Sequence, residues 1–271
     1  MRRITLHMIL FILTVASTWW TGGVAYSLTV MSILLGHELG HYFVSRSHGT
    51  RATLPFFLPF PFSPFGTLGA VIRMESHIAS RKALFDTGAA GPLTSLCLSI
   101  PAIIAGLSLS EVIPSSQIKE GTLRLADPLL FSIIQHLVLG QIPEHHDVIL
   151  HPIGYAGWVG LFVTALNLLP IGQLDGGHIA YAILGKRSRT VFILAIAFMA
   201  FITVFYNPGW FLLLILIIFF GFRHPAPLDD ETPLDGKRKL LGGITFLAFI
   251  LSFTPAPFPD FVDELRQIFE R

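Results

Sequence analysis

The chain has 271 residues, of which 52% are hydrophobic and 13% are charged, and its mean hydropathy is +0.67. Soluble domains carry about 25% charged residues, so this composition excludes an ordinary soluble protein and predicts a chain embedded in a lipid bilayer. The formal net charge of +1 gives no argument for a nucleic-acid partner. A single cysteine, Cys97, excludes an intrachain disulfide and a cysteine-rich zinc site.

Seven hydrophobic runs follow one another along the chain, and a membrane-crossing helix needs roughly 20 apolar residues. We expect six to seven of the runs to span the membrane, since the sixth and seventh are short. The basic N-terminus could belong to a signal peptide, but no small-residue cleavage site clearly follows, and a retained first span is favoured. The runs lie at about 4–20, 25–45, 86–109, 152–184, 189–206, 209–222 and 240–254.

Basic residues predict the orientation of these spans, because loops rich in Lys and Arg face the cytoplasm. One arrangement satisfies nearly all of these charges. It places the N-terminus, and the inner ends of the second and fourth runs, on the cytoplasmic side of the membrane. The residues on that side include Arg2, Arg3, Arg46, Arg51, Arg73, Arg81, Lys82, Lys186, Arg187 and Arg189.

The second run contains His37-Glu38-Leu39-Gly40-His41, which is the pattern H-E-x-x-H. Residues four apart share a face of a helix, so His37 and His41 can direct both imidazoles at one metal ion. Glu38 can then reach a metal-bound water, as in zinc hydrolases with two histidine ligands and a general base. Two histidines and a glutamate are energetically unfavourable within a membrane span unless they have a function. This disfavours the alternative, a pair of solvated histidines at a helix end beside a surface glutamate.

Catalytic zinc has three protein ligands and one open position, so we expect a third ligand from another helix at the same depth. The fourth run supplies two candidates, Asp175 and His178. Pro170 and the glycines after Asp175 are expected to break the helix and let Asp175 turn inward. The alternatives are a helix cap for Asp175 and an interfacial position for His178. Asn167 lies two turns before Asp175 and is a candidate to hydrogen-bond a substrate carbonyl or oxyanion.

Residues 54–65, between the second and third runs, are too apolar for a free loop and too rich in proline for a helix. Non-helical backbone at membrane depth is tolerated only against protein or a water-filled cavity, so we expect a re-entrant or interfacial loop. Residues 66–74 follow with small residues and a β-type run, whose open edge could pair with an extended peptide. An ordinary amphipathic surface loop is the alternative.

The third run opens at Asp86, which we expect to cap the helix. Gly88, Ala89 and Gly91 follow, and such small residues allow close packing, here against the metal-bearing helix.

Four histidines gather in the loop 110–151 and could form a second metal site. Histidines in an external loop are more often solvated, and we favour that interpretation. They are His136, His145, His146 and His151.

Three blocks of sequence resemble the site-2 protease family of intramembrane zinc metalloproteases, in its branch without a PDZ domain. The first is H-E-x-x-H at residues 37–41 within a span. The second is Asn167-x-x-Pro170 followed by Leu174-Asp175-Gly176, which matches N-x-x-P and L-D-G. The third comprises Gly66-Thr67-x-Gly69-Ala70 and the Gly-Ala-Ala-Gly-Pro stretch at 88–92.

The resemblance implies that His37, His41 and Asp175 hold one Zn²⁺ per chain and that Glu38 is the catalytic base. It also suggests that a membrane-embedded strand at residues 66–74 lends its edge to the substrate, through Gly66, Thr67, Gly69 and Ala70, with Asn167 as a further contact. The expected fold is an all-α polytopic membrane protein with six to seven transmembrane helices. A membrane-associated β-type or re-entrant loop lies between helices two and three.

The expected function is hydrolysis of peptide bonds in membrane-spanning or membrane-anchored protein substrates, within the lipid bilayer, in regulated intramembrane proteolysis. Residues 1–222 would form the metalloprotease core, and residues 223–271 a further C-terminal span and an amphipathic tail at 261–269. One alternative is a membrane zinc transporter, which should show repeated halves that the sequence lacks. The other is a catalytically inactive scaffold that binds membrane peptides.

Overall fold

The computed structural model describes residues 2–74, 78–119, 122–220 and 226–259. Most of them are helical, and two small antiparallel sheets are present, β1–β2 and β3–β4. The expectation of a helical protein with a β-type segment between the second and third spans is therefore confirmed in outline. The amphipathic tail at 261–269 lies outside the described residues.

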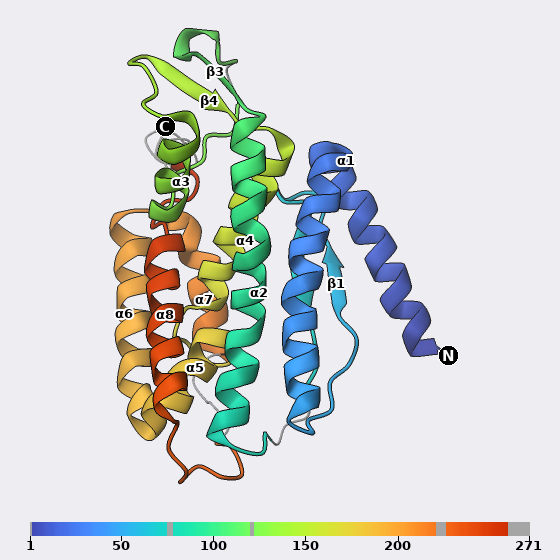
Figure 1. The fold of residues 1–271 in the computed structure, drawn as a ribbon, viewed down its shortest axis with the longest axis vertical. Helices are drawn as coiled ribbons and strands as arrows, with labels where there is room; N and C mark the ends of the chain where they lie inside the picture. Colours follow the sequence, from blue (N-terminus) through green and yellow to red (C-terminus); the bar gives the residue numbers. More distant parts are fainter. Residues whose placement is uncertain (1, 75–77, 120–121, 221–225, 260–271) are drawn as a thin grey trace.

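Helix α1 (Arg2–Ser47) is a helical hairpin rather than one rod. Gly23 adopts φ 78° at its centre, a left-handed conformation that residues with a side chain rarely take. The chain therefore reverses there, and Figure 1 shows two arms that meet at one end of the molecule. The hydroxyls of Thr18 and Ser27 lie 2.7 Å apart and tie the arms together. These arms correspond to the first two predicted spans.

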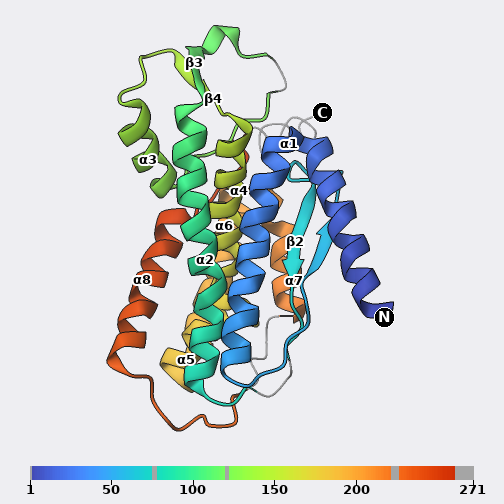
Figure 2. The ribbon, with the colours of Figure 1, turned by 45° about the vertical axis from the view of Figure 1, so that its right-hand side comes forward.

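Strands β1 (Phe56–Pro59) and β2 (Thr67–Val71) form an antiparallel hairpin in the fork of α1 (Figure 2). The side chain of Phe57 is buried and its ring packs edge-on against that of Phe11 in the first arm. The hydroxyl of Tyr26 in the second arm donates to the carbonyl of Phe65. The proline-rich segment thus lies against protein on both sides, as its apolar composition requires.

Helix α2 (Arg81–Ser108) is the centre of the bundle and packs against the second arm of α1 and against α4 (Pro152–Asn167). It begins five residues earlier than expected, because the Ser80 side chain accepts a hydrogen bond from the backbone N–H of Ala83 and caps it. The prediction that Asp86 caps this helix is therefore wrong.

The predicted fourth span, 152–184, is two helices. Helix α4 ends at Asn167, and α5 (Asp175–Leu184) begins after a seven-residue connection. The expected break is larger than a kink, because Leu168 closes α4 and the chain turns through Pro170 before helix resumes.

The remaining elements surround this core. Helices α6 (Ser188–Phe205), α7 (Phe211–Phe220) and α8 (Gly236–Ser252) follow α5 along the chain, and α6 and α8 lie to the left of α2 in Figure 1. Helix α3 (Leu129–Leu139) and strands β3 (Glu111–Pro114) and β4 (His146–Ile149) cover one end of the bundle. The described residues also include short 3₁₀ turns at Ser115–Gln117, Gly185–Arg187 and Pro208–Trp210.

Three helical segments within the described residues are long and apolar enough to cross a membrane. The first contains the bend in α1, and the third joins α5 and α6. These apolar helices identify the protein as a membrane protein. The number of spans, six to seven, stays a prediction. The segments are Ile4–Ser47, Arg81–Ser108 and Asp175–Phe205.

Ion pairs join the helix ends at the opposite end of the bundle from α3. Asp86 accepts two hydrogen bonds of 2.7 Å from Arg238 at the start of α8, and His48 lies 2.9 Å from the same carboxylate. Arg81 pairs with Asp230 in the connection that precedes α8. These contacts hold α8 against α2.

Candidate metal centre

His37 and His41 lie one turn apart on the second arm of α1, on the face that meets α2 and α5. Both residues are buried, at 4% and 5% exposure. Their Nε2 atoms are 3.0 Å apart, so both imidazoles point at the same place. The helical spacing predicted this convergence.

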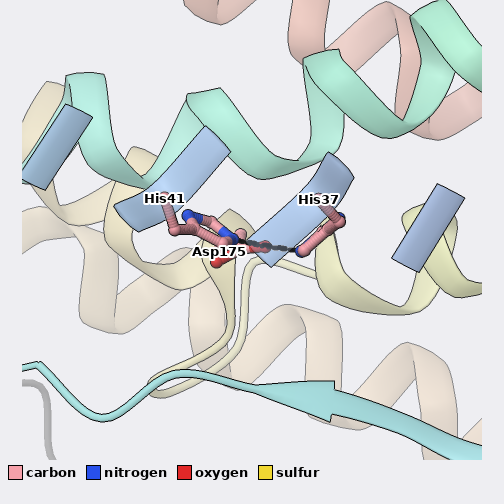
Figure 3. Close-up of side chains that lie close together, drawn as sticks. All are labelled: His37, His41 and Asp175. Carbon is pink, nitrogen blue, oxygen red and sulfur yellow. Dashed lines mark hydrogen bonds and ion pairs between the residues drawn. The ribbon is translucent and has the colours of Figure 1, made fainter. Parts of the chain in front are cut away.

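Asp175 completes the group from the first residue of α5. Its Oδ2 atom lies 3.2 Å from Nε2 of His37 and 3.2 Å from Nε2 of His41 (Figure 3). The break between α4 and α5 makes this possible, because it places a helix start, with its side chain turned inward, at the level of the two histidines. These three residues form the group of potential metal ligands found among the described residues.

The donor geometry fits a zinc ion. Two ligands bonded at roughly 2.0–2.1 Å to a tetrahedral zinc lie about 3.3 Å apart, and the three donor atoms here are 3.0–3.2 Å apart. The site also holds two carboxyl groups among apolar helices, that of Glu38, which is buried, and that of Asp175, whose side chain is 14% exposed. Buried carboxylates are stable when they are paired or coordinate a metal, so this donor set suits a divalent cation.

Glu38 lies beside His37, and only 6% of it is exposed. The backbone of Ile72, the residue after β2, lies next to its carboxylate. The segment that follows the β-hairpin therefore lies beside the candidate catalytic residue. The sequence placed a β-type run near the site, but it did not indicate this contact.

The ring nitrogens that face away from the three-residue group are also engaged. Nδ1 of His41 lies 2.8 Å from the carbonyl oxygen of Thr87, and Nδ1 of His37 lies 3.3 Å from the hydroxyl of Ser95. A carbonyl can only accept, so Nδ1 of His41 carries the hydrogen and its Nε2 lone pair faces Asp175. No pattern in the sequence indicated either partner.

Asn167 ends α4 next to the metal-site residues, with Nδ2 3.3 Å from Nε2 of His37. The structure thus brings Asn167, His37, His41, Asp175 and Glu38 together. His178, the rival third ligand, lies outside the group of three. So do the four histidines of the loop 110–151, of which His151 instead caps α4 by accepting from the N–H of Ile153.

Four of the five expected substrate-binding residues lie in the hairpin, and the fifth is Asn167 of α4. Gly66 is at its turn, where its carbonyl accepts from Ser17 of α1 at 2.5 Å. The buried hydroxyl of Thr67 donates to the carbonyl of Leu58 and accepts from the N–H of Gly69. Ala70 pairs with β1 and packs against the core. Their substrate contacts remain a prediction.

A family model described as "Peptidase family M50" matches residues 25–206. The chain is 30% identical over 234 residues to "Probable zinc metalloprotease EGY1, chloroplastic" of Arabidopsis thaliana, and 32% identical over 240 residues to "Probable zinc metalloprotease EGY2, chloroplastic" of the same plant. These alignments cover 83% and 84% of this chain. They cover 42% and 41% of the two relatives, so the chain spans about two fifths of their length.

The chain therefore belongs to peptidase family M50, the site-2 protease family of zinc metalloproteases that its motifs resembled. The matched region contains the second arm of α1 with the H-E-x-x-H motif, the hairpin, and the elements from α2 to α6.

Proposed function

We propose that this protein is an intramembrane zinc metalloprotease that hydrolyses peptide bonds in membrane-spanning or membrane-anchored proteins, as a step in regulated intramembrane proteolysis. The observation that carries the proposal is the convergence of His37, His41 and Asp175, with Glu38 beside them, in the buried interior of an apolar helical bundle. The family to which the chain belongs supports the same chemistry.

His37, His41 and Asp175 are the proposed ligands, and they leave one coordination position for water or substrate. A bound zinc ion would polarise the scissile carbonyl and make a nearby water more acidic. Glu38 takes a proton from the attacking water as the water oxygen bonds to the carbonyl carbon. The same carboxyl then gives this proton to the amide nitrogen as the C–N bond breaks, which yields a carboxylic acid and an amine; the acid then passes its remaining proton to the amine, so that the products are a carboxylate and an ammonium group.

Asn167 is proposed to hold the substrate. Its side-chain amide is close to His37 and can donate a hydrogen bond to the scissile carbonyl oxygen or to a neighbouring backbone carbonyl. A donor aimed at the oxygen that gains negative charge in the transition state contributes several kcal/mol, about 3 in measured cases.

The β-hairpin is proposed to present the substrate in an extended form. A helical segment hides its carbonyls in intrahelical hydrogen bonds and must unwind before cleavage. Strand β2 pairs with β1 along one edge, and no further strand among the described residues covers its other edge. An unwound substrate that pairs with this edge regains backbone hydrogen bonds. The contact of Ile72 with Glu38 means that such a strand would end at the site.

The metal site is proposed to open toward the cytoplasm, from which water would reach it. The basic residues Arg46, Arg81, Lys186 and Arg238 lie at the helix ends nearest the site, and basic segments of membrane proteins face the cytoplasm.

The experiment that tests the proposal is cleavage of a single-span substrate by the purified full chain in detergent, with zinc measured in parallel. Glu38→Gln should keep one zinc per chain and lower the cleavage rate by roughly 10²–10⁴-fold, because it removes the proton carrier. A chelator should abolish cleavage by the wild type, and added zinc should restore it. Cleavage by Glu38→Gln at the wild-type rate would refute the role of Glu38. Bound zinc without cleavage of any tested substrate would favour a peptide-binding scaffold.

A further inference from the structure

A chain of three buried polar groups extends from His37 away from the metal site. Nδ1 of His37 lies 3.3 Å from the hydroxyl of Ser95 on α2, and that hydroxyl lies 2.8 Å from the hydroxyl of Thr164 on α4. Ser95 is 1% exposed and Thr164 is fully buried. Water cannot readily compete for these groups, so the three side chains must satisfy one another and the backbone.

The carbonyl group that Thr164 contacts determines which atom donates in each hydrogen bond of this series. The hydroxyl of Thr164 lies 2.7 Å from the carbonyl oxygen of Gly160, which can only accept, so Thr164 donates there. Each hydroxyl has one hydrogen, so Ser95 donates to Thr164 and has none left for His37. Ser95 can then only accept, and Nδ1 of His37 must be the donor.

A second contact points to the same tautomer. The side-chain nitrogen of Asn167 lies 3.3 Å from Nε2 of His37, and an amide nitrogen only donates. Nε2 therefore accepts in this arrangement, which again leaves the ring hydrogen on Nδ1. A metal ion needs this Nε2 lone pair, which is unavailable in the other tautomer.

We propose that Ser95 and Thr164 form a directional hydroxyl relay that holds the ring hydrogen of His37 on Nδ1, so that its Nε2 lone pair stays directed at the metal ion. Both are positioning residues, because they act through His37 and do not touch the metal or the substrate. The inference rests on the proposed metal site. It adds that the affinity of the site for zinc depends on Thr164 of α4, which is linked to Nδ1 of His37 by two hydrogen bonds through Ser95.

If the relay operates, Thr164→Val should reverse the hydrogen bond between Ser95 and His37. Without an acceptor at position 164, the hydroxyl of Ser95 is free to turn and donate to Nδ1 of His37. The ring hydrogen then moves to Nε2, where it opposes metal binding. Thr164→Ser keeps the hydroxyl and the direction of the relay. Ser95→Ala removes the acceptor that anchors the ring hydrogen.

Helix α2 contains a matched control one turn after Ser95. Ser99 is equally buried, and its hydroxyl has no hydrogen-bond partner among the described residues. Ser99→Ala therefore makes the same chemical change at a similar depth in the same helix, but it leaves the relay intact.

The test measures zinc affinity of the purified full chain by competition with a chromophoric chelator, and thermal unfolding of the zinc-free protein. Thr164→Val and Ser95→Ala should each weaken zinc binding by about 10–100-fold, the usual effect of losing a partner of a metal-bound histidine. Thr164→Ser and Ser99→Ala should bind zinc as tightly as the wild type.

Two outcomes overturn the relay. One is wild-type zinc affinity in Thr164→Val. The other is equal weakening in all four variants together with lower unfolding temperatures, which would show a general packing defect. A wild-type protein that binds no zinc would instead refute the metal site itself, so failure of the relay and failure of the proposed function are distinguishable.

Discussion

Gly91 of α2 lies against the imidazole of His41, and a methyl group at this position would overlap the Nε2 atom of the ring. The absence of a side chain at residue 91 therefore lets α2 approach the histidine closely. Small residues at the start of this span were predicted to pack against the metal-bearing helix, and this contact confirms the prediction for Gly91, whereas Gly88 faces Asp175 and His178 of α5.

We expect Gly91→Ala to displace the His41 ring from the metal site. The neighbouring backbone is helical on both sides, so the ring must move rather than the methyl group. A displacement of 1 Å at a reacting centre costs about 100-fold in rate, and overpacking of a tight contact costs about 1–3 kcal/mol of stability. The measurements are zinc content, cleavage rate and thermal unfolding.

The control for this substitution is Gly243→Ala in α8, where an added methyl group meets nothing within 4 Å. Alanine is a better helix former than glycine by about 1 kcal/mol, so this variant should be as stable as the wild type or slightly more stable. Retention of full zinc content by Gly91→Ala would contradict the expected displacement.

The sequence predicted the part of the site that follows from helical periodicity. His37 and His41 share a face because they are four residues apart, and the break near Pro170 indicated that Asp175 turns inward. The contacts of Glu38 with Ile72 and of His37 with Ser95 join segments more than 30 residues apart. No local pattern in the sequence marks such pairs.

The fold was predicted less completely than the site. Hydropathy located the apolar helices, but it did not separate α4 from α5, because the connection between them is itself apolar. It also placed the start of α2 at Asp86, since the preceding residues include Arg81 and Lys82 and do not register as apolar. The Ser80 cap and the ion pair of Arg81 with Asp230 explain why the helix begins earlier.

Asp175→Ala should lower the zinc content of the purified protein well below one ion per chain, because only two protein ligands would remain. His178→Ala changes a residue on the same helix that lies outside the group of three, and it should retain one zinc. Metal analysis of both variants makes the comparison. Full zinc content in Asp175→Ala with loss in His178→Ala would identify His178 as the third ligand.

Thr67→Val should impair cleavage without changing zinc content. The buried Thr67 hydroxyl bonds to the carbonyl of Leu58 across the hairpin, at 2.9 Å, and to the N–H of Gly69 at 3.0 Å. A lost hydrogen bond costs about 1 kcal/mol, so a substrate that needs an ordered β2 should be cleaved roughly 5–10-fold more slowly.

The control is Ser63→Ala, which removes a more exposed hydroxyl at the turn of the same hairpin. Cleavage of a single-span substrate and zinc content are measured for both variants. Equal rates for Thr67→Val and the wild type would argue against a role for the hairpin in substrate binding.

The ion pair between Arg81 and Asp230 should give the protein a pH-dependent part of its stability. Arg81 donates to Asp230 at 2.8 Å, and the hydroxyl of Tyr181 donates to the same carboxylate at 3.1 Å. The hydrogen bond from Arg81 is the main reason that the pKa of Asp230 is lower than usual in the folded protein. A carboxyl group with a lowered pKa stabilises the fold at neutral pH, and this contribution disappears as the pH falls through its folded pKa.

Arg81→Gln should therefore destabilise the protein most at neutral pH, by about 1 kcal/mol or less because the pair is partly exposed. The difference from the wild type should shrink below about pH 4, where aspartates begin to take up protons. Thermal unfolding in detergent from neutral to acidic pH measures this difference, and Lys82→Gln is the control for loss of one positive charge at the same helix end. A difference between Arg81→Gln and the wild type that stays constant with pH would show that Arg81 contributes through packing, because only the charged form of Asp230 can form the ion pair.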